Sequence, residues 1–219
     1  MINLKVIICG YKGKMGNLIY QRLVKNSNYQ VVGLVDLDTV PLKDLLKQDV
    51  DAVVDFTNAG CAIENAYLCL ENNINYLSGT TGISESVIRK IGRIAKRKKL
   101  SFIICPNFSI GINLLLKSLS LIRPYFDNVE IIEQHHISKI DKPSGTALAI
   151  KRYLNEDDII IKSIRKDSNV LYHKIILKKN DEELEIMHKT TSRNAYIEGV
   201  LYSLSRLNTF KGLKRTINF

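Results

Sequence analysis

The stretch "VIICGYKGKMG", residues 6–16, decides the fold class of this chain. A run of apolar, mostly β-branched residues leads into Gly10, Gly13 and Gly16, and a helical pattern follows. Glycines at these points allow a tight turn and let the backbone approach a pyrophosphate, whose charge is stabilised at a helix N-terminus. The spacing is GxxGxxG rather than the commoner GxGxxG, so glycines that serve only a turn remain an alternative.

The first half of the chain alternates apolar runs with helical segments. Such runs are typical of parallel strands that are covered on both faces. We expect strands at 5–10, 30–36, 51–56, 74–79 and 100–106, and helices at 15–25, 41–48, 60–72, 84–98 and 110–123. This alternation predicts a Rossmann-like parallel sheet with right-handed crossovers and helices on both faces.

The pattern changes from about residue 128. Strand-like runs then follow one another, with a single helix after the "PSGTA" turn: 128–136, 157–166, 170–179 and 182–190. Consecutive strands predict an α+β domain with a mostly antiparallel or mixed sheet. From Ser192 a helical period returns, and Ala195, Val200, Leu204 and Leu207 could share a face. The chain is therefore expected to be α/β with two domains, 1–107 with 194–219 and 108–193, and the glycine loop marks the first as the nucleotide-binding domain.

Composition excludes several classes of protein. The chain has 219 residues, 45% of them hydrophobic and 25% charged, which is enough for a proper core. We find no apolar run of the ~18 residues that a membrane span needs, and no signal-peptide pattern. The four cysteines show no CxxC pairing, and Cys9 and Cys105 lie in apolar runs. Buried, reduced thiols and a cytoplasmic location are expected.

The net charge of +10 raises the possibility of a nucleic-acid partner. The lysines are scattered, however, and the densest cluster is "KRKK" at 96–99. No RNA-binding aromatic motif appears, so a Lys-rich surface without a nucleic-acid partner is favoured. A metal site is not expected either, because the four histidines have no nearby cysteine to complete a ligand set.

The second expected strand ends in "VVGLVD", which places Asp36 at about the 20-residue distance from Gly16 at which a ribose-binding carboxylate is expected. No arginine stands beside Asp36 to accept a 2′-phosphate, so NADH is favoured over NADPH. Use of both remains open, because Lys12 and Lys14 are close in sequence.

Two further loops, 55–60 and 78–82, follow expected strands. Ligands of such sheets bind beyond the carboxyl ends of the strands, so both loops should line the same cleft. Gly79 would allow the backbone to approach a ligand closely, and Thr80 and Thr81 would offer hydroxyl donors. The alternative is helix capping, for which Thr57 and Ser84 are the better candidates.

Six stretches together resemble a known family. "GYKGKMG", "VDFT", "GTTG", "PNFSIGINLL", "EQHHISKIDKPSGTA" and "HKTTSRNAYIEGVLYSL" occur in the order, and nearly the spacing, of the 4-hydroxy-tetrahydrodipicolinate (formerly dihydrodipicolinate) reductase family. The resemblance covers essentially the whole chain. It implies NAD(P)H-dependent reduction of 4-hydroxy-tetrahydrodipicolinate, with loss of water, to tetrahydrodipicolinate in the diaminopimelate route to lysine. It also implies that residues 108–193 bind the substrate and serve in oligomerisation, as a homotetramer.

The chemistry of a dicarboxylate hydride acceptor requires cations, N–H donors and a proton donor. His135 and His136 would point to opposite faces of a strand, so we expect only one to transfer protons. The resemblance gives that role to His135, with Lys139 as a second proton donor. It places His136, Gly145 and Thr146 at the substrate. The expected cofactor-binding residues are Gly10, Tyr11, Lys12, Gly13, Lys14, Met15, Asp36, Gly79, Thr80, Thr81, Cys105, Pro106, Asn107 and Phe108.

Several points stay open at this stage. Asp141 could hold Lys139 or cap a turn, and Ser144 is a candidate N-cap. The family usually has glycines where this chain has Asp167 and Leu171, which leaves the local loop conformation and subunit packing undecided. Two competing functions remain: another Rossmann-type amino-acid or semialdehyde dehydrogenase that shares only the first domain, and a non-catalytic nucleotide-binding protein.

Overall fold

The computed structural model describes residues 3–156 and 158–217. Residues 1, 2, 157, 218 and 219 fall inside the predicted domain and strand ranges but outside the described residues. The described chain divides into two compact units: the first runs to Phe108 and resumes over Ile197–Ile217, and the second covers Ser109–Tyr196. The sequence prediction ended the first domain at 107 and resumed it at 194.

The first unit is built on a six-stranded sheet in which every pairing is parallel. Its strands are β1 (Leu4–Cys9), β2 (Tyr29–Val35), β3 (Ala52–Asp55), β4 (Asn75–Ser78), β5 (Ser101–Ile104) and β10 (Gly212–Lys214). Their order in the sheet is β10-β5-β4-β3-β1-β2. The predicted Rossmann-like parallel sheet is confirmed, with its strand order reversing at β1.

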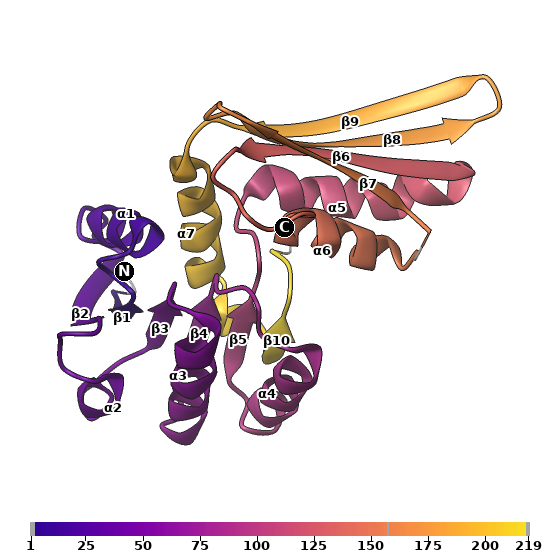
Figure 1. Cartoon of the computed structure of the whole chain (residues 1–219). Helices are drawn as coiled ribbons and strands as arrows, with labels where there is room; N and C mark the ends of the chain where they lie inside the picture. The colour runs from indigo at the N-terminus through magenta and orange to yellow at the C-terminus, as the bar shows by residue number, and fades with distance from the viewer. Residues whose placement is uncertain (1–2, 157, 218–219) are drawn as a thin grey trace. The chain divides into compact units, whose positions relative to one another are not determined.

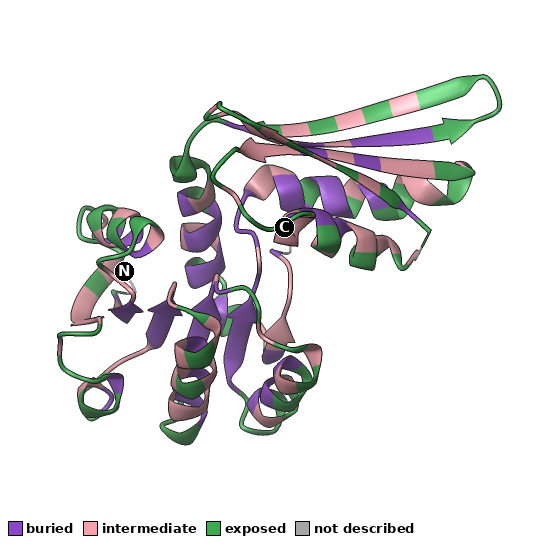
Figure 2. Ribbon diagram, in the orientation of Figure 1, coloured by how far each residue is buried: buried purple, intermediate pink, exposed green. Residues whose placement is uncertain are grey.

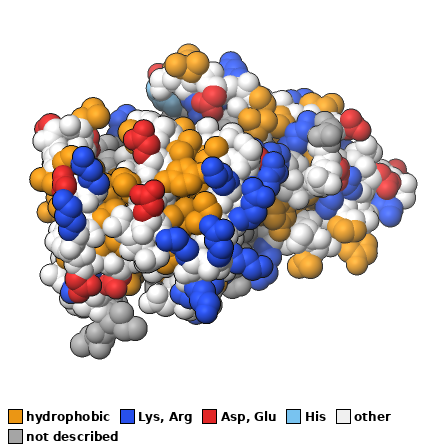
Figure 3. Space-filling model, turned by 90° about the horizontal axis from the view of Figure 1, so that it is seen from below, with side chains coloured by type: hydrophobic (Ala, Val, Ile, Leu, Met, Phe, Trp, Pro, Cys, Tyr) orange, Lys and Arg blue, Asp and Glu red, His pale blue; other side chains and the backbone are white. Residues whose placement is uncertain are grey.

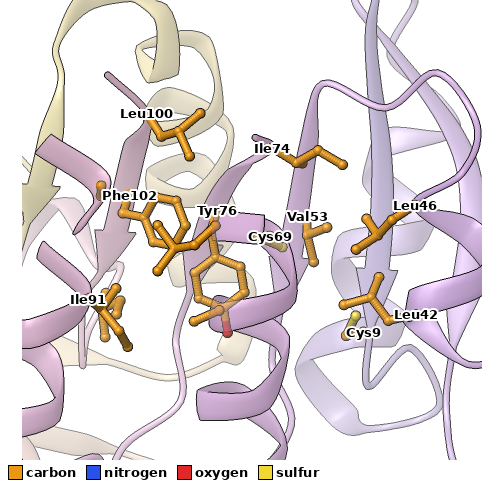
Figure 4. Packing of buried hydrophobic residues seen from close by; sticks show 14 of the residues in the cluster. Cys9, Leu42, Leu46, Val53, Cys69, Ile74, Tyr76, Ile91, Leu100 and Phe102 are labelled. Atoms are coloured by element: carbon orange, nitrogen blue, oxygen red, sulfur yellow. The ribbon is translucent and has the colours of Figure 1, made fainter. Parts of the chain in front are cut away.

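Helices lie on both faces of this sheet, as predicted (Figure 1). Figure 1 shows α1 (Lys14–Leu23) and α7 (Ile197–Ser205) on one side, and α2 (Leu42–Leu45), α3 (Ala59–Glu71) and α4 (Glu85–Arg97) on the other. The central strands β1, β3, β4 and β5 are almost entirely buried, whereas the edge strand β2 is only partly buried (Figure 2). In the core against α3 and α4, the rings of Tyr76 and Phe102 lie 5.4 Å apart (Figure 4). Burial on both faces explains why these strands have near-continuous apolar sequences.

The C-terminal segment differs from the prediction. The expected helix from about 194 begins at Ile197 and ends at Ser205, and Ala195 lies in the preceding 3₁₀ turn, exposed. The 3₁₀ turn Leu207–Thr209 follows, and the chain then adds the edge strand β10, which was not predicted. A three-residue strand that starts with Gly212 has no apolar run to reveal it, because its pairing with β5 depends on backbone hydrogen bonds.

The second unit has a four-stranded mixed sheet, in agreement with the prediction. Its strands, in the spatial order β7-β6-β8-β9, are β6 (Asn128–His136), β7 (Ile160–Lys166), β8 (Leu171–Lys179) and β9 (Glu182–Thr190). The β6–β7 pair is parallel, whereas β6–β8 and β8–β9 are antiparallel. Figure 1 shows α5 (Ile110–Ile122) and α6 (Gly145–Leu154) over one face of this sheet. The 3₁₀ turn Arg123–Tyr125 links α5 to β6.

Side-chain alternation along β6 sets the position of the polar residues in this unit. Ile131 packs in the core beneath the sheet with Ile175 and Leu177 of β8. Because successive side chains alternate between faces, Glu133 and His135 continue the face of Ile131. The helix-covered face therefore changes from apolar to ionisable toward the carboxyl end of β6.

Basic side chains gather on the face of the molecule seen in Figure 3. Lys96 and Arg97 lie in the last turn of α4, and Lys98 and Lys99 follow it. Cations at this position complement the partial negative charge of a helix C-terminus. Arg89, Arg93, Lys96 and Lys211 also line a surface hollow of about 620 Å³. The "KRKK" cluster thus has a structural explanation that requires no nucleic acid.

The cysteines are free thiols, as predicted. Cys9, Cys69 and Cys105 are buried, whereas Cys61 is partly exposed. Burial raises the pKa of the Cys105 thiol to about 11, which keeps it protonated and unreactive at neutral pH. Among the described residues, no helix combines the length and hydropathy needed to cross a membrane.

Candidate functional site

The loop that joins β1 to α1 depends on its glycines. Gly10 has φ +78°, and a Cβ there would lie 2.7 Å from the carbonyl oxygen of Phe56. A Cβ on Gly16 would lie only 2.0 Å from the carbonyl oxygen of Gly10. The first helical turn therefore packs directly on the loop backbone, which places the N-terminus of α1 against the end of β1.

The N-terminus of α1 has the properties of an anion site. Gly13 is its N-cap, and no side chain caps the helix. The predicted residues Tyr11, Lys12, Lys14 and Met15 lie around this N-cap in the loop and the first turn. Uncapped N–H groups carry partial positive charge and bind phosphate well. The glycine cradle and the open N-terminus fit the pyrophosphate of a dinucleotide.

Substitution of Gly16 by alanine tests this packing. We expect the free energy of unfolding of the first unit to fall by about 2 kcal/mol, because the new methyl group must displace backbone atoms. Urea unfolding followed by circular dichroism measures the change. Gly60→Ala is the matched control, since a Cβ there meets only the Asn58 side chain, at 3.4 Å. Equal stability of the two variants would contradict the proposed contact.

The structure brings Asp36 to the glycine loop. Asp36 Oδ2 accepts a hydrogen bond from the Lys12 backbone N–H at 2.9 Å, and Oδ1 accepts one from Leu37 N–H at 3.0 Å. A carboxylate has further lone pairs for ribose hydroxyls. The Lys12 ammonium is paired with Asp38, at 2.7 Å from Oδ1, so its charge is already partly neutralised.

Phe56, which is not among the residues predicted from the sequence, contacts three of the cofactor candidates: Gly10, Gly79 and Phe108. A Cβ on Gly79 would lie 2.1 Å from the Phe56 ring, so Gly79 leaves the space that this ring fills. The rings of Phe56 and Phe108 lie 5.8 Å apart. Because the Phe56 carbonyl also contacts Gly10, the loops after β1, β3, β4 and β5 meet at one edge of the sheet.

A buried carboxylate shapes the loop after β3. Asp55 Oδ1 accepts hydrogen bonds from the N–H and hydroxyl of Thr57 at 2.9 and 2.6 Å. Its Oδ2 accepts from Asn65 at 2.7 Å and from the Tyr76 hydroxyl at 2.9 Å. The prediction that Thr57 caps α3 is therefore wrong. Asn58 caps it by accepting the Cys61 N–H at 3.1 Å, because Thr57 is held by Asp55.

The other predicted residues of the first unit lie near this edge. The Thr80 hydroxyl donates to the Thr57 carbonyl at 3.3 Å, which ties the third loop to the second, and Thr81 follows it. Ser84 is the N-cap of α4, without a side-chain capping bond. Cys105 donates to the carbonyl of Asn107 at 3.0 Å, on the loop after β5 that also holds Pro106. Every predicted cofactor residue thus lies at the carboxyl edge of this sheet.

In the second unit, His135 lies in an ionisable cluster at the carboxyl end of β6. Its Nδ1 is hydrogen-bonded to Oε2 of Glu133, which is fully buried. Arg165 stands opposite His135 in the β6–β7 register, and its guanidinium lies 2.9 Å from Oε1 of Glu133. Neither Glu133 nor the guanidinium of Arg165 was among the predicted site residues. An acid two places before a histidine on a strand is the signal that could have found Glu133.

His173 on β8 closes the cluster on the other side. Its ring lies edge-on to His135, 5.3 Å between centroids, and its Nε2 lies 3.3 Å from Oγ of Ser144. Burial lowers the pKa of His173 to about 3. Burial also lowers the pKa of His135, although Glu133 opposes this effect. Both imidazoles are therefore neutral at pH 7.

The loop after β6 carries the second proton-transfer candidate. The Lys139 ammonium lies 2.8 Å from Asp141, which also accepts a hydrogen bond from the Gly145 backbone at the start of α6, so Asp141 holds Lys139 and contacts the helix start as well. Arg165 fixes this loop by donating to the carbonyls of Lys139, at 3.2 Å, and Asp141. Ser144 is the N-cap of α6, as suggested, and accepts the Ala147 N–H at 3.2 Å.

The predicted substrate residues divide into two groups. Gly145 and Thr146 form the first turn of α6, beside the cluster that contains Ser144. His136 points to the other face of β6 and bonds Ser138 at 2.8 Å and Asp167 at 3.2 Å. Asp167, where the family usually has a glycine, thus interacts with a residue of the predicted substrate set.

Glu133, His135 and His173 each offer one potential metal-binding atom, and these atoms lie within 4.8 Å of one another. The pattern of histidines and cysteines in the sequence does not reveal this group, because one of its three members is a carboxylate. Arg165 already neutralises Glu133, and a cation would have to compete with it. The arrangement suits proton transfer without a metal.

Comparison with known proteins gives the same family over both units. The family model described as dihydrodipicolinate reductase, N-terminus, matches residues 4–108. The model for the C-terminus matches residues 111–217. The matched residues include the glycine loop and the whole stretch from Glu133 to Ala147.

Individual relatives agree. The 4-hydroxy-tetrahydrodipicolinate reductase of Carboxydothermus hydrogenoformans is 32% identical over 246 residues, covering 93% of this chain and 94% of the relative. The enzyme of the same name from Dictyoglomus turgidum is 29% identical, with 98% of both chains covered. The solved structure of dipicolinate-bound dihydrodipicolinate reductase from Paenisporosarcina sp. TG-14 has a TM-score of 0.86 at 27% identity, with 98% of both chains covered.

Proposed function

This chain belongs to the dihydrodipicolinate reductase family, and on that premise we propose that it reduces 4-hydroxy-tetrahydrodipicolinate, with loss of water, to tetrahydrodipicolinate in lysine biosynthesis. The observation that carries this proposal is the family match across both units. A dehydrogenase related only through its nucleotide domain would not match over residues 111–217, which contain the His135 cluster. The family match therefore favours the reductase over both competing functions.

The family uses a pyridine nucleotide, and the first unit supplies a suitable site. When bound, the reduced nicotinamide supplies the hydride that the substrate ring accepts. The open N-terminus of α1 would hold the pyrophosphate, and Asp36 the adenosine ribose. NADH is the preferred cofactor in this proposal, because the ammonium of Lys12, whose backbone contacts Asp36, is paired with Asp38.

Cofactor preference gives a direct prediction. We expect a higher kcat/KM with NADH than with NADPH, and a ratio about tenfold smaller for Asp36→Asn, since the charge that repels a 2′-phosphate is removed. Steady-state kinetics with each cofactor measures the ratio. Asp49→Asn is the control, because Asp49 pairs with Lys5 and is not among the cofactor candidates. A wild type that prefers NADPH would refute the preference for NADH.

The second unit offers donors for a dicarboxylate. The solved relative is bound to dipicolinate, a dicarboxylate. In this chain Gly145 and Thr146 lie at the start of α6, where the helix dipole favours a carboxylate. Lys139 and His136 supply further donors. His135 manages the proton that neutralises the ring after reduction, with Lys139 as a second donor.

We expect a homotetramer that forms through the second unit's sheet. Ile160 and Ile164 on β7 and Met187 on β9 are exposed large apolar side chains. Exposed apolar side chains on a sheet are a common basis of subunit contacts. Analytical ultracentrifugation measures the mass, and a monomer at micromolar concentration would rule the tetramer out.

A coupled assay tests the reaction itself. A synthase generates the substrate from pyruvate and aspartate semialdehyde, and cofactor absorbance is followed with NADH and NADPH separately. Oxidation of either cofactor that depends on the synthase supports the proposal. No turnover with either cofactor, by a protein with the expected circular dichroism, would overturn it.

A further inference from the structure

Glu133 is a fully buried carboxylate on the helix-covered face of β6. Burial of a carboxylate is costly unless a cation and hydrogen bonds compensate it. The structure provides both: the Arg165 guanidinium, itself only 5% exposed, lies 2.9 Å from Oε1, and the Ser144 N–H approaches the same oxygen at 3.4 Å. Oε1 is therefore fully engaged, and Oε2 is directed at His135.

The contact to His135 has a chemical consequence. An ionised carboxylate can only accept hydrogen bonds, so the Nδ1 atom that it contacts must carry a proton. In a neutral imidazole the lone pair then lies on Nε2. The side chain of His135 is 12% exposed, so most of the ring is packed while a small part stays accessible.

We propose that Glu133 is the positioning residue of His135: its carboxylate, anchored by Arg165, holds the Nδ1–H tautomer and presents Nε2 as the atom that exchanges a proton with the substrate. This inference rests on the proposed function, which gives His135 the proton transfer. Arg165 has a linked task, because it also fastens the loop that carries Lys139. The same guanidinium thus sets the position of both proton-transfer groups.

The charged and titratable groups that face His135 come from every neighbouring element. They are Glu133 on β6, Arg165 on β7, His173 on β8 and Lys139 on the following loop. Burial lowers the pKa of His135, and so do Lys139 and Arg165, whereas Glu133 raises it. Removal of the Glu133 charge should therefore lower this pKa further. A proton donor is active while protonated, so the limb of the pH–kcat profile that falls with rising pH should move to lower pH.

Glu133→Gln tests the proposal, because the amide keeps an oxygen for Arg165 but loses the charge. We expect kcat to fall about 10²-fold, the falling limb to move to lower pH, and KM for NADH to change less than about threefold. Glu130→Gln is the matched control: the same substitution on the same strand breaks an ion pair with Lys162 on β7, but on the opposite face. This control should keep the wild-type profile.

A second measurement does not depend on activity. The chain has only four histidines, so long-range ¹H–¹⁵N correlation spectra can resolve each imidazole. We expect the Nδ1–H tautomer for His135 in the wild type and its loss in Glu133→Gln. A wild-type His135 with the proton on Nε2 would overturn the inference, even if Glu133→Gln did not fold. An unshifted pH profile in a folded Glu133→Gln variant would also overturn it. If the wild type had the Nδ1–H tautomer at His135 but no turnover, the result would count against the proposed function instead.

Discussion

His135→Gln is expected to lower kcat at least ~10²-fold in the coupled assay, the scale of loss typical of a proton-transfer residue. Glutamine has a similar length and keeps hydrogen-bonding capacity, but it cannot give a proton to the substrate or take one from it. The side chain is packed between Glu133 and the His173 ring, so a neutral polar replacement should leave the fold intact. KM for the cofactor should change little, since the cofactor candidates lie in the first unit.

His136→Gln provides the contrast, because it changes the same residue type one position along the same strand. His136 lies on the other face and bonds Ser138 and Asp167. We expect it to raise KM for the substrate more than it lowers kcat, as for a residue that contributes binding rather than proton transfer. If His135→Gln retained more than about a tenth of wild-type kcat, His135 could not be the main proton donor. Equal changes of kcat and KM in His135→Gln and His136→Gln would also show that His135 is not the main proton donor.

Local signals made the first unit predictable. Apolar runs such as the one that forms β1 reflect burial on both faces, and Gly10 and Gly16 mark a turn that only glycine permits. The same reasoning failed where structure depends on partners distant in sequence. Strand β10 exists because its backbone pairs with β5, and the cap of α3 moved from Thr57 to Asn58 because buried Asp55 holds Thr57.

The ionisable cluster around His135 also depends on residues that are distant in sequence. The sequence displays Glu133, His135 and Lys139 in one conspicuous stretch, but Arg165 and His173, which complete the cluster, come from β7 and β8. Arg165 reaches Glu133 through a parallel pairing whose register depends on the intervening α6 and its flanking loops. No spacing rule encodes such a register. The motif could therefore indicate the chemistry of the site but not the residues that hold it in place.

The largest effect on stability is expected from His173 and should appear as acid destabilisation of the second unit. Burial lowers its pKa to about 3 in the folded state, whereas an unfolded histidine titrates near 6.5. Between these values the unfolded state binds more protons than the folded state, so stability is lost as pH falls from about 6.5 toward 3. The pKa difference corresponds to about 4–5 kcal/mol over that range.

His173→Gln should remove this part of the pH dependence, because the amide can keep the hydrogen bond to Ser144 but binds no proton. Urea unfolding at a series of pH values measures the slope, and His136→Gln, at a side chain that is 43% exposed, should keep the wild-type slope. Direct titration of the His173 imidazole by NMR gives a second test that needs no variant. Protonation of His173 near pH 6 in the folded protein, or parallel slopes for wild type and His173→Gln, would contradict the expectation. The neutral state of His173 also matters for the neighbouring His135, since a second imidazolium 5.3 Å away would oppose protonation of the proton-transfer group.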